Sequence, residues 1–211
     1  MKLVRRRVHM GLTVASLTAF PTIHRGAILD RQGERRMSIQ TASINTAKVQ
    51  GRRNLRFAAY DELRGDVDRL TSGPVKVLGN WSPGQIFRHL AIAYNASIDG
   101  FTMTFPLHLC LIGRVFRKKL RTMQMPAGFK LPPNGAAMLE PPSTATDEGA
   151  AQLRAAIERL EREPKRAKHP MFGELTREEW DRVHLTHASL HLSFLIPERA
   201  ATVVGPEPGR S

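Results

Sequence analysis

The segment "WDRVHLTHASLHLSFLIPE", residues 180–198, combines the apolar spacing of a packing helix with three histidines. At about 100° per residue, one arc of roughly 120° on that helix holds both kinds of side chain. The residues within the arc are Trp180, Val183, His184, His187, His191, Phe194 and Leu195. The histidines are therefore expected to point inward. A buried neutral imidazole has one donor and one acceptor nitrogen to satisfy, so three together are costly unless something such as a metal ion uses them.

His187 and His191 are four residues apart, so on a helix their Cβ atoms lie about 6 Å apart and both rings can reach one ion. The metalloprotease motif HExxH has this spacing, but its glutamate is missing here because Ala188 follows His187. A third ligand should then come from another helix. His89, in "SPGQIFRHLAIAYNA", shares a face with Ile86 and with small alanines that leave space beside its ring. We therefore predict a metal site of His89, His187 and His191, with an ordinary core histidine as the alternative for His89.

His184 lies one turn before His187 on the same stripe. The helical spacing makes it difficult for all three histidines of this segment to bind one ion, so we expect His184 to support the ligands or to line a pocket. A fourth-ligand role is the alternative. His108 and His169 have no partner in the sequence and are expected to be ordinary histidines. No arrangement typical of a catalytic triad is recognisable, so no catalytic side chain is assigned.

Helical spacing and capping signals predict four or five helical segments. They are residues 60–73, 81–100, 105–121, 147–163 and 175–197. Ser82 and Gln85 form a predicted capping box with Pro83 at the first helical position, and Thr176 with Glu179 forms another. In the first and fourth segments, the residues expected in the core are Leu63, Val67, Leu70, Ala150, Leu153, Ile157 and Leu160.

Strand signals are scarce, since no run of alternating β-branched residues is bounded by a hairpin turn. The expected fold class is therefore all-α, an antiparallel up-down four-helix bundle with additions. We place the bundle in residues 51–198, between an N-terminal extension at residues 1–50 and a disordered C-terminal tail at residues 199–211. The proline-rich segment at residues 125–145 is expected to be a long loop, and a loop of this length is either functional or loose.

Composition limits the kinds of site and partner. The 211 residues suffice for one domain with a buried core. The single cysteine, Cys110, excludes an intrachain disulfide and cysteine-rich zinc sites, so a metal must be held by histidine and oxygen. The formal charge of +13 would suggest nucleic acid, but residues 1–36 and the runs at 114–121 and 165–168 hold much of it. No aromatic residues interleave with the run at 165–168 to stack on bases, so we expect no nucleic-acid partner.

Residues 1–36 have the outline of a signal peptide, a basic start followed by the moderately apolar "MGLTVASLTAF". That apolar stretch is short, contains Thr13 and Ser16, and ends at Pro21 without a clear cleavage site. It is also too short to span a bilayer. We expect a disordered extension or an over-extended start, with translation from Met37, and hence a cytoplasmic protein without a transmembrane helix. An export signal is the alternative.

Four stretches together resemble the DinB/YfiT-like superfamily of metalloenzymes, and most closely its domain-of-unknown-function 1569 family. They are "GNWSPGQIFRHLA" (79–91), "IDGF" (98–101), "MPAGFKLP" (125–132) and "HPMFGELTREEWDRVHLTHASLHLSFL" (169–195). The resemblance implies a DinB-like up-down four-helix bundle and a three-histidine metal site, which carries over to His89, His187 and His191. Many relatives have a further histidine and a glutamine near the last two ligands, where this chain has Leu190 and Phe194.

The resemblance also implies a class of activity, because characterised members of the superfamily include thiol-dependent transferases and hydrolases. The function expected here is a metal-dependent enzyme in which Zn²⁺, Ni²⁺ or Fe²⁺ keeps one open position for water or for the thiolate of a small-molecule substrate. A non-catalytic metal-binding or stress-related helical bundle is the alternative. A homodimer is compatible with either function.

Overall fold

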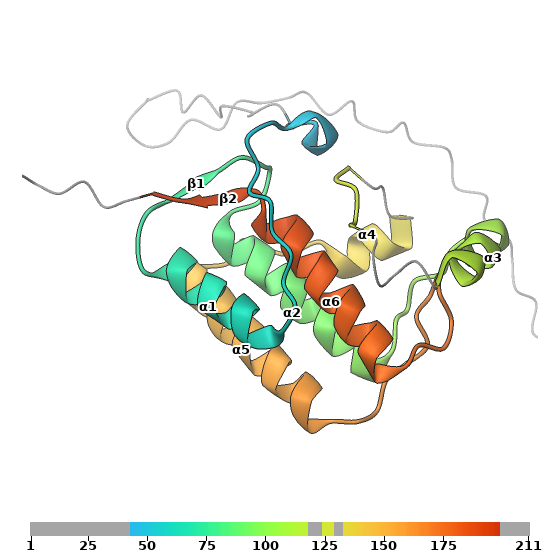
Figure 1. The fold of residues 1–211 in the computed structure, drawn as a ribbon. Helices are drawn as coiled ribbons and strands as arrows, with labels where there is room; N and C mark the ends of the chain where they lie inside the picture. Colours follow the sequence, from blue (N-terminus) through green and yellow to red (C-terminus); the bar gives the residue numbers. More distant parts are fainter. Residues whose placement is uncertain (1–42, 118–123, 129–132, 199–211) are drawn as a thin grey trace, which may run out of the picture. The chain divides into compact units, whose positions relative to one another are not determined.

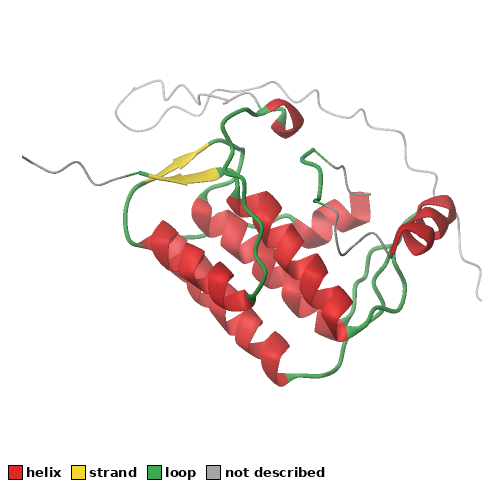
Figure 2. Cartoon of the chain, viewed as in Figure 1, coloured by secondary structure: helices red, strands yellow, loops and turns green. Residues whose placement is uncertain are grey.

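The computed structural model describes residues 43–117, 124–128 and 133–198, and most of these residues are helical (Figure 1, Figure 2). The leader at 1–36, the basic end of the third segment at 118–121 and the tail at 199–211 lie outside the described residues. In chain order the elements are η1 (Thr46–Lys48), α1 (Tyr60–Thr71), β1 (Val75–Val77), α2 (Pro83–Asp99), α3 (Leu107–Phe116), α4 (Pro133–Leu139), α5 (Thr146–Arg162), α6 (Arg177–Leu192) and β2 (Leu195–Pro197). The expectation of a mainly helical protein is confirmed.

Helices α1, α2, α5 and α6 pack against one another around a shared hydrophobic core (Figure 1). Every core position predicted on α1 and α5 is buried, with at most 1 % of its surface exposed. Helix α2 contacts both α5 and α6, and Phe87, Leu90 and Tyr94 on it are fully buried. Because α2 is enclosed by its neighbours, a histidine on it faces the interior of the protein.

Both predicted capping boxes are present and begin the two helices that carry the candidate ligands. At the start of α2, the Gln85 backbone N–H donates to Ser82 Oγ at 3.2 Å, and the Ser82 N–H donates to Gln85 Oε1 at 3.0 Å. Thr176 and Glu179 make the same reciprocal pair at the start of α6. The boxes satisfy backbone donors that have no partner inside the helix, and so they fix where each helix begins.

The C-terminal end of the last helix differs from the sequence prediction. Helix α6 ends at Leu192, and residues 195–197 form β2, which pairs antiparallel with β1. The expectation that the helix runs to Pro197 was therefore wrong. Two short strands are present although strand signals in the sequence are scarce. The physical reason is length, because a strand of three residues is too short for an alternating pattern to be recognised, and its partner is more than a hundred residues away in the chain.

The expected loop at 125–145 contains the short helix α4, Pro133–Leu139. Its first residue is a proline, which suits the start of a helix because the missing N–H would have no partner there. The prolines that indicated a loop therefore also mark where a helix begins. Residues 129–132, which precede α4, lie outside the described residues.

Helix α3 exposes much of its apolar surface, with Leu107 at 73 % and Val115 at 75 % exposed. Its described part ends at Phe116, short of the predicted end at residue 121. No helix within the described residues combines the length and the apolarity needed to cross a membrane.

Helices α2 and α5 approach so closely that glycine is required on both. A Cβ atom built on Gly149 would overlap the backbone oxygen of Gly84, and one on Gly84 would overlap the carbonyl oxygens of Thr144 and Ala145. The neighbouring atoms are backbone, which cannot turn aside as a side chain can. The start of α2 is therefore held against the start of α5 by direct backbone packing.

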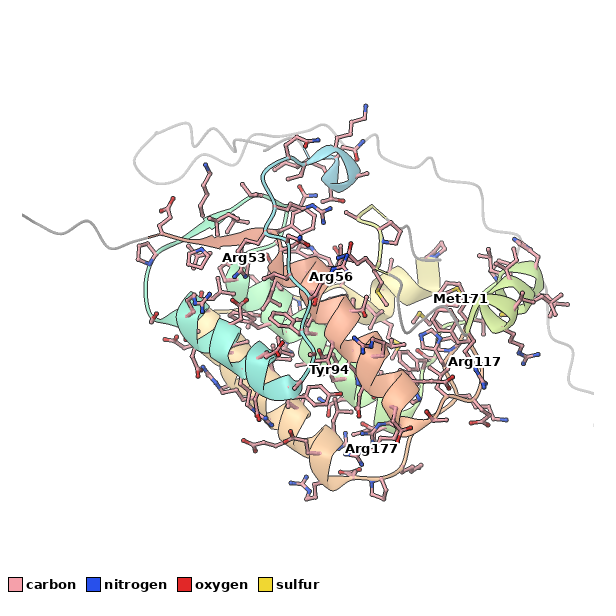
Figure 3. All side chains as sticks on the ribbon, in the orientation of Figure 1. Arg53, Arg56, Tyr94, Arg117, Met171 and Arg177 are labelled. Atoms are coloured by element: carbon pink, nitrogen blue, oxygen red, sulfur yellow. The ribbon has the colours of Figure 1, made fainter. Side chains whose placement is uncertain are left out.

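A partly buried ion pair joins the segment before α1 to α1 itself and to the end of α6. Arg53, labelled in Figure 3, donates from Nη1 and Nη2 to the two carboxylate oxygens of Asp66, each at 2.7 Å. Nη2 also donates to the Leu192 carbonyl at 3.0 Å, and the Arg53 backbone N–H donates to the Ser193 carbonyl at 3.0 Å. Arg53 thus occupies the carbonyls that the end of α6 leaves without helical partners.

Replacing Gly149 with alanine should lower the melting temperature, because the added methyl group has only the backbone of Gly84 to displace. Overpacking of this kind costs about 1–3 kcal/mol, and each kcal/mol lowers the melting temperature of such a domain by roughly 2–4 °C. Gly65→Ala is the matched control, since Gly65 is an exposed glycine of α1 with no atom within 4 Å of an added Cβ. A melting temperature at or above wild type for Gly149→Ala would contradict the close packing.

Asp66→Asn should destabilise the protein strongly, because it leaves the Arg53 guanidinium without its charge partner. Breaking a fully buried pair costs about 3–5 kcal/mol, and this pair should cost less because Arg53 is 16 % exposed. The control is Asp61→Asn on the same helix, whose carboxylate is 91 % exposed and pairs with Arg64 at the surface. Urea denaturation of the two variants should give midpoints far apart, and equal midpoints would show that the Arg53 pair is not structural.

Candidate metal centre

Two helices far apart in the sequence bring His89, His187 and His191 together. His89 comes from α2, and His187 and His191 are on successive turns of α6. One ligand-capable atom of each residue lies within 4.8 Å of the others. The Nε2 atoms of His89 and His187 are 3.1 Å apart. These are the three residues for which the sequence predicted a shared site.

The carbonyl of Leu139, the last residue of α4, determines which nitrogen of His89 carries the proton. His89 Nδ1 lies 2.7 Å from this oxygen, which can only accept, so Nδ1 must donate. In the neutral ring Nε2 then keeps its lone pair and directs it toward His187. A backbone carbonyl that orients an imidazole in this way is a common support for a histidine ligand. No residue type or spacing indicates this partner in advance, because every residue has a carbonyl.

Burial keeps all three imidazoles in the neutral form. It lowers the pKa of His89, and it lowers those of His187 and His191 well below the usual histidine range. The neighbouring rings add to the effect at His187, since a second positive charge there would repel the first. Neutral imidazoles offer lone pairs, which is the form that binds a metal ion.

Trp81 covers one side of the cluster. Its ring stacks on His191 with centroids 5.6 Å apart and an angle of 16°, and its centroid is 4.8 Å from that of His89. Trp81 directly precedes the capping residue Ser82, so the start of α2 also positions this ring. Trp81 has no recognisable role in the sequence, and only the fold brings it to His191.

The histidine cluster opens into a cavity of about 600 Å³ whose walls are mainly apolar. No Asp, Glu, Lys or Arg lines it among the described residues. The segment expected as a long loop, residues 125–145, contributes Met125 to Gly128 and also Leu139 to the wall, and η1 contributes Thr46. Leu190 and Phe194, where many relatives were expected to have polar residues, line the cavity as well. The cavity thus suits a small uncharged molecule with apolar parts.

Residues 43–50, assigned to the extension from the sequence, contact the helical body. The Ile44 backbone donates to Asn80 Oδ1 at 2.7 Å, and Asn80 Nδ2 donates back to the Ile44 carbonyl at 2.9 Å. Asn80 lines the cavity together with Thr46. This part of the chain therefore forms one wall of the cavity.

His184 lines the same cavity but is not a member of the three-histidine cluster. It is 2 % exposed, and burial lowers its pKa to about 3. Its Nδ1 lies 3.0 Å from the Tyr60 hydroxyl, which also donates to Asp181 Oδ1 at 2.8 Å. Tyr94, labelled in Figure 3, donates to the His184 carbonyl at 2.9 Å. Both tyrosines hold this turn of α6 in place.

His169 is a cavity residue that sequence reasoning missed. Its Nδ1 accepts the backbone N–H groups of Met171 and Phe172, each at 3.1 Å, and burial lowers its pKa to about 4. Its ring packs between those of Phe172 and Trp180. The available signal was the aromatic and glycine-containing stretch that follows it, "HPMFG", which forms a tight turn closed by the bridge between His169 and Gly173. His108, by contrast, is exposed on α3.

Comparison with known proteins gives one match. Residues 49–198 match the family described as "Protein of unknown function (DUF1569)". No curated protein and no solved structure is similar enough to count as a match. The matched range contains helices α1 to α6 and each histidine of the cluster. The match covers well over half of the chain, and the protein therefore belongs to the DUF1569 family.

Proposed function

We propose that this protein is a metal-dependent enzyme of the DinB-like superfamily, acting as a thiol-dependent transferase or hydrolase on a small molecule. The observation that supports the proposal most is the convergence of His89, His187 and His191 at a mainly apolar cavity. Imidazole ligands suit Zn²⁺, Ni²⁺ and Fe²⁺. The proposal includes the up-down bundle of that superfamily, while a cytoplasmic location and a homodimer stay predictions.

The donor set fits such an ion. With Zn–N bonds of about 2.0–2.1 Å, two nitrogens on one tetrahedral ion lie about 3.3 Å apart. The two Nε2 atoms of His89 and His187 are 3.1 Å apart. His89 Nε2 is unprotonated because Nδ1 donates to Leu139. His191 supplies the third nitrogen, within 4.8 Å of the other two.

Three protein ligands favour catalysis over a structural role, because structural zinc sites have four protein ligands and catalytic sites leave one position for water or substrate. No cysteine or carboxylate joins the three histidines in the cluster found among the described residues. A bound divalent ion would lower the pKa of water or of a thiol and so supply a nucleophile that the side chains themselves do not.

The side chains around the cluster perform the other tasks. The Leu139 carbonyl holds the His89 ring, and Trp81 packs against His191 and limits the access of water from that side. The apolar walls bind the uncharged part of a substrate and strengthen electrostatic interactions by excluding solvent. The cavity offers no charged side chain among the described residues, so a strongly anionic substrate is disfavoured.

The purified protein, without a histidine tag, should contain close to one divalent ion per chain by elemental analysis. Affinity for the metal should fall in each of the variants His89→Ala, His187→Ala and His191→Ala. The loss should be at least roughly 10- to 100-fold, which is the loss expected when a group that only supports a ligand is removed. His108→Ala is the control at an exposed histidine, and His184→Ala should keep most of the metal. Circular dichroism checks that each variant is folded. Wild-type metal content in folded triad variants would refute the ligand assignment.

The bound ion should keep one exchangeable position. After cobalt substitution, addition of a small thiol such as 2-mercaptoethanol should produce a thiolate-to-metal charge-transfer band in the near ultraviolet, because the thiolate takes the position that the protein leaves open. Trp81→Ala should change the apparent affinity for the thiol while the cobalt stays bound, since Trp81 covers the cluster without ligating. A visible spectrum that ignores thiols and small anions would indicate a closed, structural site.

A further inference from the structure

Helix α3 (Leu107–Phe116) presents an exposed apolar face. Six large hydrophobic side chains are exposed among the described residues, and four of them are on α3. At about 100° per residue, these four fall within one arc of roughly 140°, which also holds the exposed His108. The four residues, with exposed fractions from 52 to 75 %, are Leu107, Leu111, Ile112 and Val115. Apolar residues gathered in this way indicate a binding surface, since exposed hydrophobic residues are normally scattered singly.

The opposite side of α3 is held by the loop at residues 169–174. A Cβ atom built on Gly113 would lie 2.6 Å from the Met171 carbonyl oxygen, so the loop passes directly against the helix. Arg117, which follows the helix, donates from Nη1 to the Glu174 carbonyl at 2.7 Å (both Arg117 and Met171 are labelled in Figure 3). Because these contacts fix which side of the helix is covered, the apolar face is left to solvent.

The charges that border this face are positive. Residues 100–139 contain six Lys or Arg and no Asp or Glu. Among them, Arg114 is exposed and is adjacent to the apolar arc on the helix. The carboxylates near α3 belong to the segments on its covered side, where each is paired with a base, Glu179 with Arg117 at 3.3 Å and Glu174 with Lys168 at 3.1 Å. A partner that covers the face should therefore be both apolar and negatively charged.

We propose that α3 binds the surface of a membrane that contains anionic lipid, with its apolar face at the boundary between headgroups and acyl chains. A helix that is apolar on one face and basic at the border suits this boundary, because burial of apolar area and attraction to anionic headgroups add to the same binding. The helix lies along the membrane surface in this arrangement and does not cross it. Each contribution is modest, so the binding is reversible.

Charge disfavours the other occupants that this chain itself could supply. A second copy would bring two basic faces together in a chain that already carries a formal charge of +13. One face of a ten-residue helix is also small beside the roughly 800 Å² that each partner buries in a stable interface. The N-terminal segment, residues 1–36, has eight Lys or Arg against two acidic residues, so it would repel the border of the face as well.

Sedimentation of the full-length protein with lipid vesicles tests this assignment. The protein should bind vesicles of phosphatidylcholine and phosphatidylserine at physiological salt, and should bind much less to vesicles of phosphatidylcholine alone. The double variant Leu111→Gln/Val115→Gln should bind at least about tenfold more weakly, because it removes apolar area while glutamine still favours a helix. Arg114→Gln should weaken binding about fivefold, which corresponds to about 1 kcal/mol for one basic residue near an anionic surface.

Two control variants make the same changes elsewhere. Ile44→Gln alters an apolar residue that is 45 % exposed outside α3, and Arg162→Gln alters a side chain that is 72 % exposed on α5. Both should bind within about twofold of wild type, since a residue away from the membrane contributes little to binding.

Absence of binding to vesicles that contain phosphatidylserine would overturn the proposal. Equal binding by wild type and by folded α3 variants would also overturn it, because another basic segment would then be responsible. A dimer that forms without lipid and is lost in Leu111→Gln/Val115→Gln, measured by analytical ultracentrifugation, would assign the face to a second copy instead.

Discussion

The backbone contact between Gly84 and Gly149 sets the position of the whole candidate site. It holds the start of α2 against the start of α5, and His89 follows Gly84 by little more than one helical turn. Gly84 also packs against the backbone of Thr144 and Ala145. These two residues follow closely after Leu139, whose carbonyl holds the His89 ring. Gly84 and Gly149 thus fix both the ligand and the group that orients it. A larger side chain at either position would separate the two.

The second helix of the site is held from the opposite side by α1 and the segment before it. Arg53 binds the carbonyls at the end of α6 and pairs with Asp66 on α1. Tyr60, the first residue of α1, bonds to Asp181 and His184 on α6. These polar contacts fix the position of α6 along its length, which apolar packing alone does less well because it has little directional preference. His187 and His191 therefore meet His89 on a rigid support.

Charge is divided between the surface and the interior. The chain carries a formal charge of +13, yet the cavity has no charged lining residue among those described, and burial holds its histidines in the neutral form. Burial lowers the pKa of each imidazole in the cavity, so that no positive charges accumulate inside at neutral pH. Three of these neutral rings, those of His89, His187 and His191, could hold a metal ion.

The sequence by itself determined those features that depend on neighbours along the chain. Helical spacing identified Leu63 and Val67 on α1 and Ile157 on α5 as core residues, the capping boxes marked the starts of α2 and α6, and the inward stripe of histidines identified the candidate ligands. Each of these signals repeats within a few residues, because a helix brings positions three and four apart onto one face.

Only the tertiary structure decided which distant groups complete the site. The Leu139 carbonyl, the Trp81 ring and the pairing of β1 with β2 all involve partners far away in the sequence. A carbonyl is present on every residue, so no residue type announces that the one on Leu139 will meet His89. The two strands are too short to show a period. The pairing of the two strands and the shape of the cavity both follow from how the helices pack. Helix packing depends on contacts through space, and a single sequence contains no local pattern for such contacts.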